Sequence, residues 1–291
     1  MGLKPSERLK KGIQALSVYG DFFSVRYAGL SIKTNRRTKM IISTISEKGG
    51  VGKTTTTVNT ARCLAGKGKR VLLIDLDQQG NASKALGFTH DGKPTSAELI
   101  YNAIAGIEMN YSEVIRHSES GVDYIPASAM LTGITTFIAN DSDSSYVIKR
   151  ALDKDVFKEY DYIFFDCRTL LDLLAANALN ASSHVIIPVE SGLYSYMGLH
   201  KMIDKVKSIN NSTNRQLKIL GILFNKIQRT VVAQEIVSEV KTRYGNFVFD
   251  TTVPFCPAQA EQAILEDKMS SDKSTLGRAF ISIADEIIER K

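Results

Sequence analysis

Along most of the chain, short apolar runs alternate with longer segments in which apolar residues recur every three or four positions. The short runs are rich in β-branched residues, which is typical of strands buried on both faces of a sheet. The longer segments have the period of amphipathic helices. The runs predict strands at 40–46, 71–75, 122–126, 162–166, 185–189, 219–225 and 247–251. The periodic segments predict helices that include 54–66, 196–209, 232–244 and 276–290.

This alternation predicts an α/β fold of the doubly wound type, with a mostly parallel sheet and helices on both of its faces. In sheets of this kind, ligands bind at the carboxyl ends of the strands. We therefore expect the loops 47–52, 77–81 and 166–169 to meet at one edge of the sheet and to form the site.

The first of these loops has the sequence of a phosphate-binding loop, or P-loop. Segment 41–59 reads IISTISEKGGVGKTTTTVN, which is an apolar strand, a glycine-rich turn, Gly-Lys-Thr and a helix-compatible stretch. In such a loop, backbone N–H groups and a helix N-terminus surround a phosphate. We expect Lys53 to contact the β- and γ-phosphates of ATP and the Thr54 hydroxyl to bind Mg²⁺. The predicted nucleotide-binding residues of the loop are Gly49, Gly50, Val51, Gly52, Lys53, Thr54 and Thr55.

The loop departs from the usual pattern at its start. Glu47 stands where the first glycine is usual, and Lys48 adds a second lysine. A second lysine is not required to hold phosphate within one subunit. It therefore suggests a task at the nucleotide of a neighbouring subunit.

Several segments, in order along the chain, resemble the ParA/MinD family of ATPases. The loop KGGVGKTT resembles the deviant P-loop of that family, and RVLLIDLDQQGN (70–81) resembles its next strand and loop, with Gln78 where proline is usual. The segments that continue the match are GVDYIPAS (121–128), YDYIFFDC (160–167), HVIIPVESGLYSYMGL (184–199), LKILGILFNK (217–226) and TTVPFCPAQAEQA (251–263). The resemblance covers about residues 39–290. It is closest to the ParA/Soj branch, whose members segregate plasmids and chromosomes.

Three acidic residues lie at or just after the ends of two predicted strands beside the loop. The resemblance implies that Asp77 orients the water that attacks the γ-phosphate, so that Lys48, Lys53 and Asp77 form the catalytic set. Asp75 projects to the same side of its strand and is a candidate to support Mg²⁺ through water. Asp166 follows an apolar strand, at the position of a Mg²⁺-linked acid in P-loop ATPases. A solvated carboxylate at a strand end is the alternative for each acid.

On the opposite side of the loop, Asn225 ends an apolar strand with Lys226 behind it. An amide offers both a donor and an acceptor, which suits the edge of an adenine base. The resemblance implies that Pro254 and Phe255 line the base.

Two further departures from the family pattern bear on the site. Arg168 and Thr169 follow Cys167 where the family has two prolines, which frees the backbone of this loop and adds a positive charge near the phosphates. Gly192 stands where the family tends to carry glutamate, which puts one contact between subunits in doubt.

Charge and composition add a basic N-terminal extension to this outline. Residues 1–39 hold nine basic and two acidic residues, whereas the whole chain of 291 residues has a net charge of +6. We expect two units, an extension (1–39) and a P-loop ATPase domain (40–291). The extension is interpreted as a DNA-contacting arm, a dimer-stabilising arm or a solvated tail. The chain has no apolar run long enough for a membrane span and three widely spaced cysteines, which is typical of a cytoplasmic protein.

The resemblance implies a bacterial, nucleoid-associated partition ATPase. ATP and Mg²⁺ would fill two sites in a face-to-face homodimer, with Lys48 reaching the opposite nucleotide. The dimer would bind DNA without sequence preference, through basic residues such as Arg229, Lys241 and Arg243, and a centromere-binding ParB-like partner would stimulate hydrolysis. One alternative is a membrane-surface ATPase like MinD, which the acids of the last helix disfavour. The other is a non-catalytic DNA-binding regulator that uses ATP as a switch.

Overall fold

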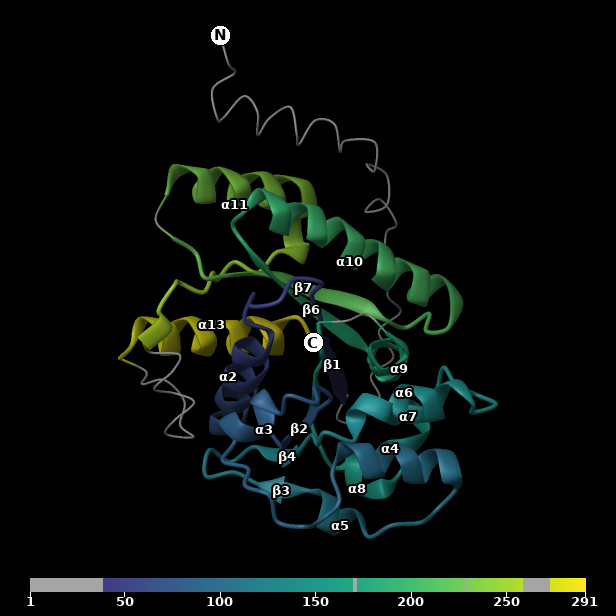
Figure 1. The fold of residues 1–291 in the computed structure, drawn as a ribbon. Helices are drawn as coiled ribbons and strands as arrows, with labels where there is room; N and C mark the ends of the chain where they lie inside the picture. Colours follow the sequence, from purple (N-terminus) through teal and green to yellow (C-terminus); the bar gives the residue numbers. More distant parts are fainter. Residues whose placement is uncertain (1–38, 170–171, 229, 259–272) are drawn as a thin grey trace.

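The computed structural model describes residues 39–169, 172–228, 230–258 and 273–291. Within them lies one seven-stranded sheet with the strand order β3-β4-β2-β5-β1-β6-β7 (Figure 1). Its strands are β1 (Met40–Thr44), β2 (Val71–Asp75), β3 (Arg116–His117), β4 (Asp123–Ile125), β5 (Tyr162–Asp166), β6 (His184–Glu190) and β7 (Lys218–Asn225). All neighbouring strands are parallel except β3, which pairs antiparallel with β4. The predicted α/β fold with a mostly parallel sheet is confirmed.

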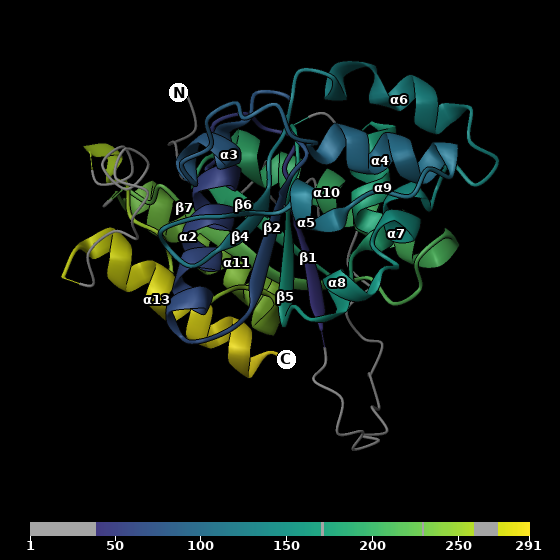
Figure 2. The same ribbon diagram turned by 90° about the horizontal axis from the view of Figure 1, so that it is seen from below.

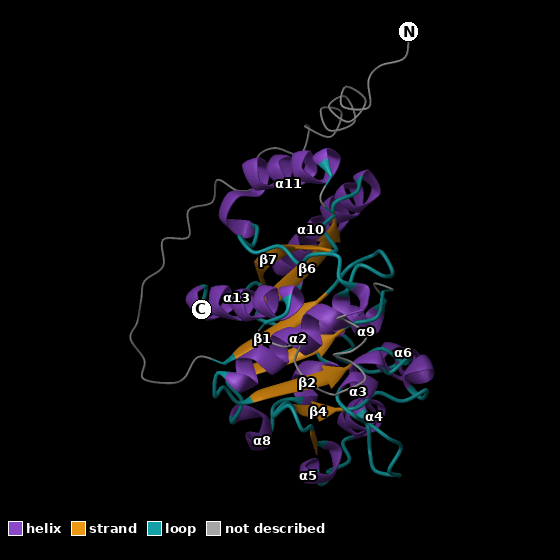
Figure 3. Ribbon diagram, turned by 90° about the vertical axis from the view of Figure 1, so that its left-hand side faces the viewer, coloured by secondary structure: helices purple, strands orange, loops and turns teal. Residues whose placement is uncertain are grey.

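Helices cover both faces of the sheet (Figures 2 and 3). One face carries α2 (Lys53–Gly66), α3 (Asn81–Ala85) and α13 (Thr275–Glu289). The other face and the β7 edge carry α4 (Ser96–Ala105), α5 (Tyr111–Val114), α6 (Leu131–Ala139), α7 (Val147–Ala151), α8 (Asp155–Lys158), α9 (Leu173–Ala181), α10 (Leu193–Ser212) and α11 (Val231–Tyr244). A 3₁₀ turn, η3 (Gly245–Phe247), follows α11.

Side chains of successive strand residues enter opposite cores, as the pleat of a strand requires. Leu72 and Ile74 of β2 belong to the core beneath α4 and α9, whereas Leu73 packs beneath α2 and α13. Because the strands are buried on both faces, they read as continuous apolar runs in the sequence.

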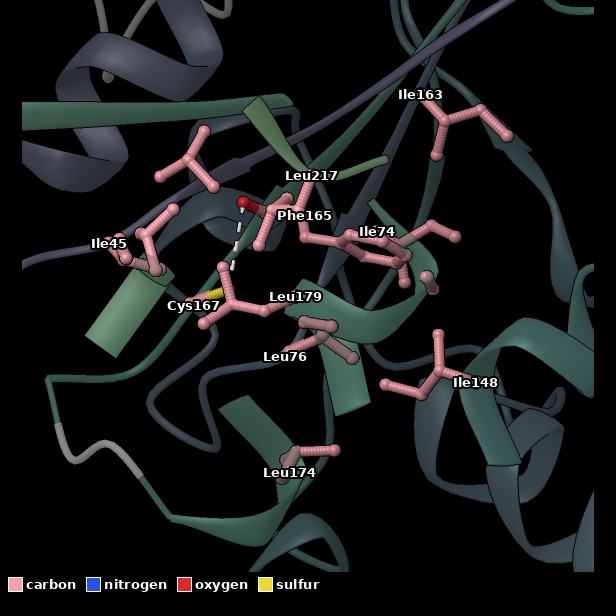
Figure 4. Close-up of a cluster of buried hydrophobic side chains, with 14 of the residues drawn as sticks. Ile45, Ile74, Leu76, Ile148, Ile163, Phe165, Cys167, Leu174, Leu179 and Leu217 are labelled. Carbon is pink, nitrogen blue, oxygen red and sulfur yellow. Dashed lines mark hydrogen bonds between the residues drawn. The ribbon is translucent and has the colours of Figure 1, made fainter. Parts of the chain in front are cut away.

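The residues that leave the central strands are themselves core residues. Ile45 follows β1, Leu76 follows β2 and Cys167 follows β5, and all three are buried in the same apolar cluster (Figure 4). This cluster fixes the point at which each loop of the candidate site begins.

One predicted strand is wrong. Segment 247–251 makes a single parallel bridge to β7, between Ile222 and Val248, rather than a strand. The Thr251 N–H, which a ladder with β7 would use, donates to Glu286 of α13 together with the neighbouring Asp250 N–H. The next bond to β7 comes from Val253, whose N–H donates to the Phe224 carbonyl. The short strand β3 was not predicted.

The last helix is part of the core. Its apolar residues, which include Phe280, Ile283 and Ile287, are buried against α2 and the sheet. Among the described residues, no helix has the length and apolarity needed to cross a membrane. Residues 1–38 lie outside the described ranges, so the boundary and role of the extension stay predictions.

Candidate active site

The P-loop joins the end of β1 to the start of α2. Gly50 and Gly52 have φ angles of 78° and 86°, a left-handed conformation that glycine adopts without strain. Among the described residues, no group accepts a hydrogen bond from the backbone N–H groups of residues 49–55. Gly52, at the N-cap of α2, supplies no side-chain cap. These unpaired donors at a helix N-terminus are suited to an anion such as a phosphate.

Asn225 holds this loop from the side of β7. Its buried Nδ2 donates to the Val51 carbonyl at 3.0 Å and to the Thr56 hydroxyl at 2.8 Å. A Cβ atom at Gly52 would lie 3.0 Å from the same Nδ2, so a larger residue would push this amide away. The Oδ1 atom of Asn225 is buried without a hydrogen-bond partner. The predicted contact of Asn225 with a base stays a prediction, and the structure adds a positioning task that the sequence did not reveal.

Lys53 lies in the centre of the site and is 8% exposed. Its ammonium donates to the Thr169 hydroxyl at 3.0 Å. Burial lowers the pKa of Lys53, and the carboxylates of Asp166 and Asp77 oppose this effect. The P-loop and the loops after β2 and β5 therefore meet at Lys53, as the strand-end argument predicted.

Asp166 connects the start of α2 to β5. Its Oδ2 accepts a hydrogen bond from the Thr54 hydroxyl at 2.7 Å, and the Thr57 hydroxyl lies 3.2 Å from Oδ1. Asp75 lies opposite Asp166 in the pairing of β2 with β5. Burial raises the pKa of both carboxyls, and for Asp166 the neighbouring Asp75 adds to the increase.

These groups fit a magnesium ion. A hydroxyl and carboxylates are the oxygen ligands that Mg²⁺ prefers, and a cation would relieve the repulsion between the two buried acids. The described residues hold no group of three or more His, Cys, Asp or Glu side chains around one point. One or two carboxylates beside a phosphate site are the usual arrangement for Mg²⁺.

Asp75 and Asp77 differ in their surroundings. Both oxygens of Asp75 already accept hydrogen bonds, Oδ1 from the Asp77 backbone N–H and Oδ2 from the backbone and hydroxyl of Ser83. Asp77 is half-buried, and its Oδ1 accepts a hydrogen bond from the Gln79 backbone at 3.0 Å. The carboxylate of Asp77 therefore has more free acceptor sites for a ligand than the carboxylate of Asp75.

Lys48 does not lie among the phosphate-facing groups. Its ammonium donates to Oε2 of Glu190, the last residue of β6. Lys226 approaches Oε1 of the same carboxylate at 4.0 Å and donates to the Gly50 carbonyl. Lys226 has a φ angle of 54°, and it is the one described non-glycine residue with a positive φ.

A pocket of about 210 Å³ lies beside the loop, on the β7 side. Its lining includes Thr55 and Asn225 together with Pro254, Phe255 and Cys256. Phe255 is 50% exposed, so its ring is accessible to a ligand. The structure thus brings the predicted base-side residues Asn225, Pro254 and Phe255 to one hollow next to the phosphate loop.

Arg168 lies in the loop after β5. Its guanidinium pairs with Asp172, the N-cap residue of α9, at 3.2 Å, and its Nη1 atom is buried without a hydrogen-bond partner.

Thr57, Thr169 and Glu190 were missed from the sequence. Thr57 was detectable, since it lies one helical turn after Thr54. Glu190 ends the apolar strand β6 as Asp166 ends β5, so the same pattern at a strand end indicates it.

The chain is similar to several known proteins. The family profile of the AAA domain matches residues 39–219. The sporulation initiation inhibitor protein Soj of Bacillus subtilis is 34% identical over 255 residues, which are 85% of this chain and 97% of that protein. The chromosome-partitioning ATPase Soj of Treponema pallidum is 34% identical over 250 residues, which are 84% of this chain and 96% of that protein.

A solved structure with a similar fold contains nucleotide. Cobyrinic acid a,c-diamide synthase of Mycobacterium smegmatis, crystallised with an ATP analogue and magnesium, has a TM-score of 0.74 and 26% identity. The similarity covers 87% of this chain and 95% of that one.

Proposed function

This chain belongs to the ParA/MinD superfamily of P-loop ATPases, in the branch that contains Soj, and we propose that it is a partition ATPase that segregates plasmid or chromosomal DNA. The observation that carries the ATPase assignment is the P-loop itself. It combines unpaired backbone donors with a buried lysine and a Thr54–Asp166 pair at one helix N-terminus.

The residues have distinct tasks in this proposal. The N–H groups of residues 49–55 and the Lys53 ammonium bind the phosphates of ATP, and the pocket at Pro254 and Phe255 receives the base. Thr54 and Asp166 would hold Mg²⁺, which supplies positive charge to the phosphate oxygens when bound. Asp77 orients the water that attacks the γ-phosphate, so that ADP and inorganic phosphate leave.

Lys48 is proposed to act on a second copy of the chain. It is half-exposed, and its ammonium points to Glu190 rather than to the Lys53 side of the loop. In a face-to-face homodimer, Lys48 of each protomer would reach the phosphates of the other. The nucleotide would then stabilise the interface, and hydrolysis would weaken it.

The dimer is proposed to bind the phosphates of the DNA backbone, since residues 1–39 alone carry a net charge of +7. Arg229, one of the basic candidates, lies outside the described residues. Lys241 pairs with Asp250 at 3.8 Å, whereas Arg243 lies in the last turn of α11. A ParB-like partner would stimulate hydrolysis and release the DNA.

A membrane-surface function of the MinD type has less support. It requires a helix whose apolar face can enter the lipid interface. The apolar face of α13 is buried in the core, and its last turn is tied to the sheet by Arg290.

Two substitutions in the same loop test the proposal. Lys53→Ala removes the cation at the phosphates, so affinity for ATP-Mg²⁺ should fall by a factor of ten or more, because a lost charged hydrogen bond is worth about 1.5–3 kcal/mol. Lys48→Ala should keep monomer binding and lose the ATP-dependent dimer. Calorimetry measures the affinity for ATP-Mg²⁺, and light scattering measures the ATP-dependent dimer. Co-sedimentation with DNA measures DNA binding by each variant. An ATP-dependent dimer in Lys48→Ala would exclude the proposed contact between subunits.

A further inference from the structure

Glu190, at the end of β6, forms a charged cluster with Lys48 and Lys226. Glu190 itself has no task in nucleotide binding so far. We propose that Glu190 is a positioning residue that holds Lys48 on its own protomer and thereby sets how readily the ATP-dependent dimer forms. The inference rests on the proposed function, because it concerns the same lysine before it reaches a second subunit.

The position of Glu190 follows from the order of the strands. β6 lies between β1, which leads into the P-loop, and β7. The last pair of the β6–β7 ladder is Glu190 with Asn225, so Glu190 and Lys226 emerge side by side next to the P-loop. A carboxylate at this point therefore lies within reach of a lysine in the loop.

Both oxygens of the Glu190 carboxylate face a lysine. Oε2 accepts a hydrogen bond from Lys48, and Oε1 lies 4.0 Å from the ammonium of Lys226. Lys226 in turn donates to the Gly50 carbonyl inside the loop. Glu190 thus restrains the Lys48 side chain, whereas Lys226 restrains the backbone of the loop.

These two contacts can be separated by substitution. Glu190→Gln would remove the negative charge and keep a side chain of similar size. The bond between Lys226 and Gly50 does not involve Glu190, so the backbone of the loop should keep its shape. Glu190→Gln should therefore weaken the restraint on the Lys48 side chain and leave the loop backbone in place.

The strength of the contact suits a reversible restraint. The side chains of Lys48 and Glu190 are 50% and 25% exposed, respectively. Exposed ion pairs change an equilibrium by up to about fivefold. The phosphates of a nucleotide carry several negative charges, so they can replace one carboxylate as the partner of Lys48. Because a homodimer needs two lysines to move, a middle value of about threefold for each pair gives an effect of Glu190 on dimer formation of about tenfold.

The same loop provides a matched control. Glu47 is the residue before Lys48, and its carboxylate pairs with Lys201 of α10 at 3.5 Å. Glu47→Gln changes the charge of the loop by the same amount as Glu190→Gln and does not break the contact of Lys48 with Glu190. A general effect of charge on nucleotide binding would appear in both variants.

The experiment measures dimer formation of the full chain with a non-hydrolysable ATP analogue and Mg²⁺, by sedimentation across a range of protein concentrations. Glu190→Gln should dimerise at a concentration about tenfold lower than wild type, while Glu47→Gln stays within about twofold of wild type. The advantage should shrink at about 1 M salt, which screens exposed charges. Equal curves for the two variants, or a weaker dimer in Glu190→Gln, would overturn the inference.

A second measurement follows the contact without a dimer. The rate of lysine acylation is measured in the nucleotide-free protein, relative to the rate at the exposed Lys93. Compared with wild type, Lys48 should be acylated about twofold faster or more in Glu190→Gln and at an unchanged rate in Glu47→Gln. An unchanged rate of acylation at Lys48 in Glu190→Gln would contradict the proposed restraint. If wild type forms no dimer with the analogue, the proposed function fails first. The inference then falls with it, whatever the labelling shows.

Discussion

Asn225→Asp is a sharp test of how the P-loop is held. The substitution keeps the shape of the side chain and replaces its buried NH₂ group with an oxygen. That NH₂ group donates to the Val51 carbonyl and to the Thr56 hydroxyl. The hydroxyl can rotate and donate to the new oxygen, but the Val51 carbonyl would face a second acceptor.

The expected cost combines two effects. One lost hydrogen bond to a buried carbonyl costs about 1–3 kcal/mol. Asn225 is 2% exposed, so the new carboxyl would be desolvated and its pKa would be raised. An acid with a raised folded-state pKa loses stability as the pH rises from its unfolded value through its folded value. We therefore expect a loss of about 3 kcal/mol at pH 8, a melting temperature lower by roughly 6–12 °C, and a smaller loss at pH 5.

Nucleotide affinity should fall as well, because the loop is no longer drawn toward β7. We expect at least a tenfold loss for ADP, which corresponds to about 1.4 kcal/mol. Asn177→Asp is the matched control, since the buried Nδ2 of Asn177 donates to the carbonyls of Ser144 and Leu173 away from the site. It should lower stability and leave ADP affinity unchanged.

Thermal unfolding and calorimetry of the two variants give these values. A nucleotide-free Asn225→Asp protein as stable as wild type, with only its preference for adenine over guanine lost, would refute the positioning task. It would leave Asn225 as a reader of the base alone.

Three further predictions concern catalysis, pH and the extension. Asp77→Ala should bind ATP and dimerise but show little turnover, as measured by phosphate release; wild-type turnover would exclude Asp77 as the residue that orients water. Burial and the neighbouring Asp75 raise the pKa of Asp166 above the usual range of a carboxyl, so nucleotide-free wild type should lose stability as the pH rises above that range; Asp166→Asn should gain in melting temperature relative to wild type between pH 5 and pH 8, and a constant gap would contradict this. Deletion of residues 1–39 should flatten the log–log salt dependence of DNA binding by roughly two units without changing ATP affinity; an unchanged slope would show that the extension does not touch DNA.

The sequence predicted the parts of the site that depend on local pattern. Lys53 and Thr54 follow from the P-loop motif, and Asp166 follows from its place at the end of an apolar strand. The structure brings these residues together because β1 and β5 are neighbours in a parallel sheet.

The remaining contacts depend on which elements meet in space. Lys53 donates to Thr169 because β5, which leads to Thr169, pairs with β1, and Glu190 reaches Lys48 because β6 lies beside β1. Segment 247–251 has the composition of a strand, but the Thr251 N–H donates to Glu286, which lies 35 residues further along the chain. A pattern along the chain carries no information about such partners.

The same segment also affects how the protein behaves at high concentration. β7 is an edge strand, and an uncovered edge invites strand addition and aggregation. Its outward carbonyls are already occupied: that of Leu220 by Arg290, that of Ile222 by the Phe249 backbone, and that of Phe224 by the Val253 backbone. This edge therefore offers few free acceptors to a second chain. We expect copies of the protein to resist fibre growth along β7, so that association is left to the nucleotide face.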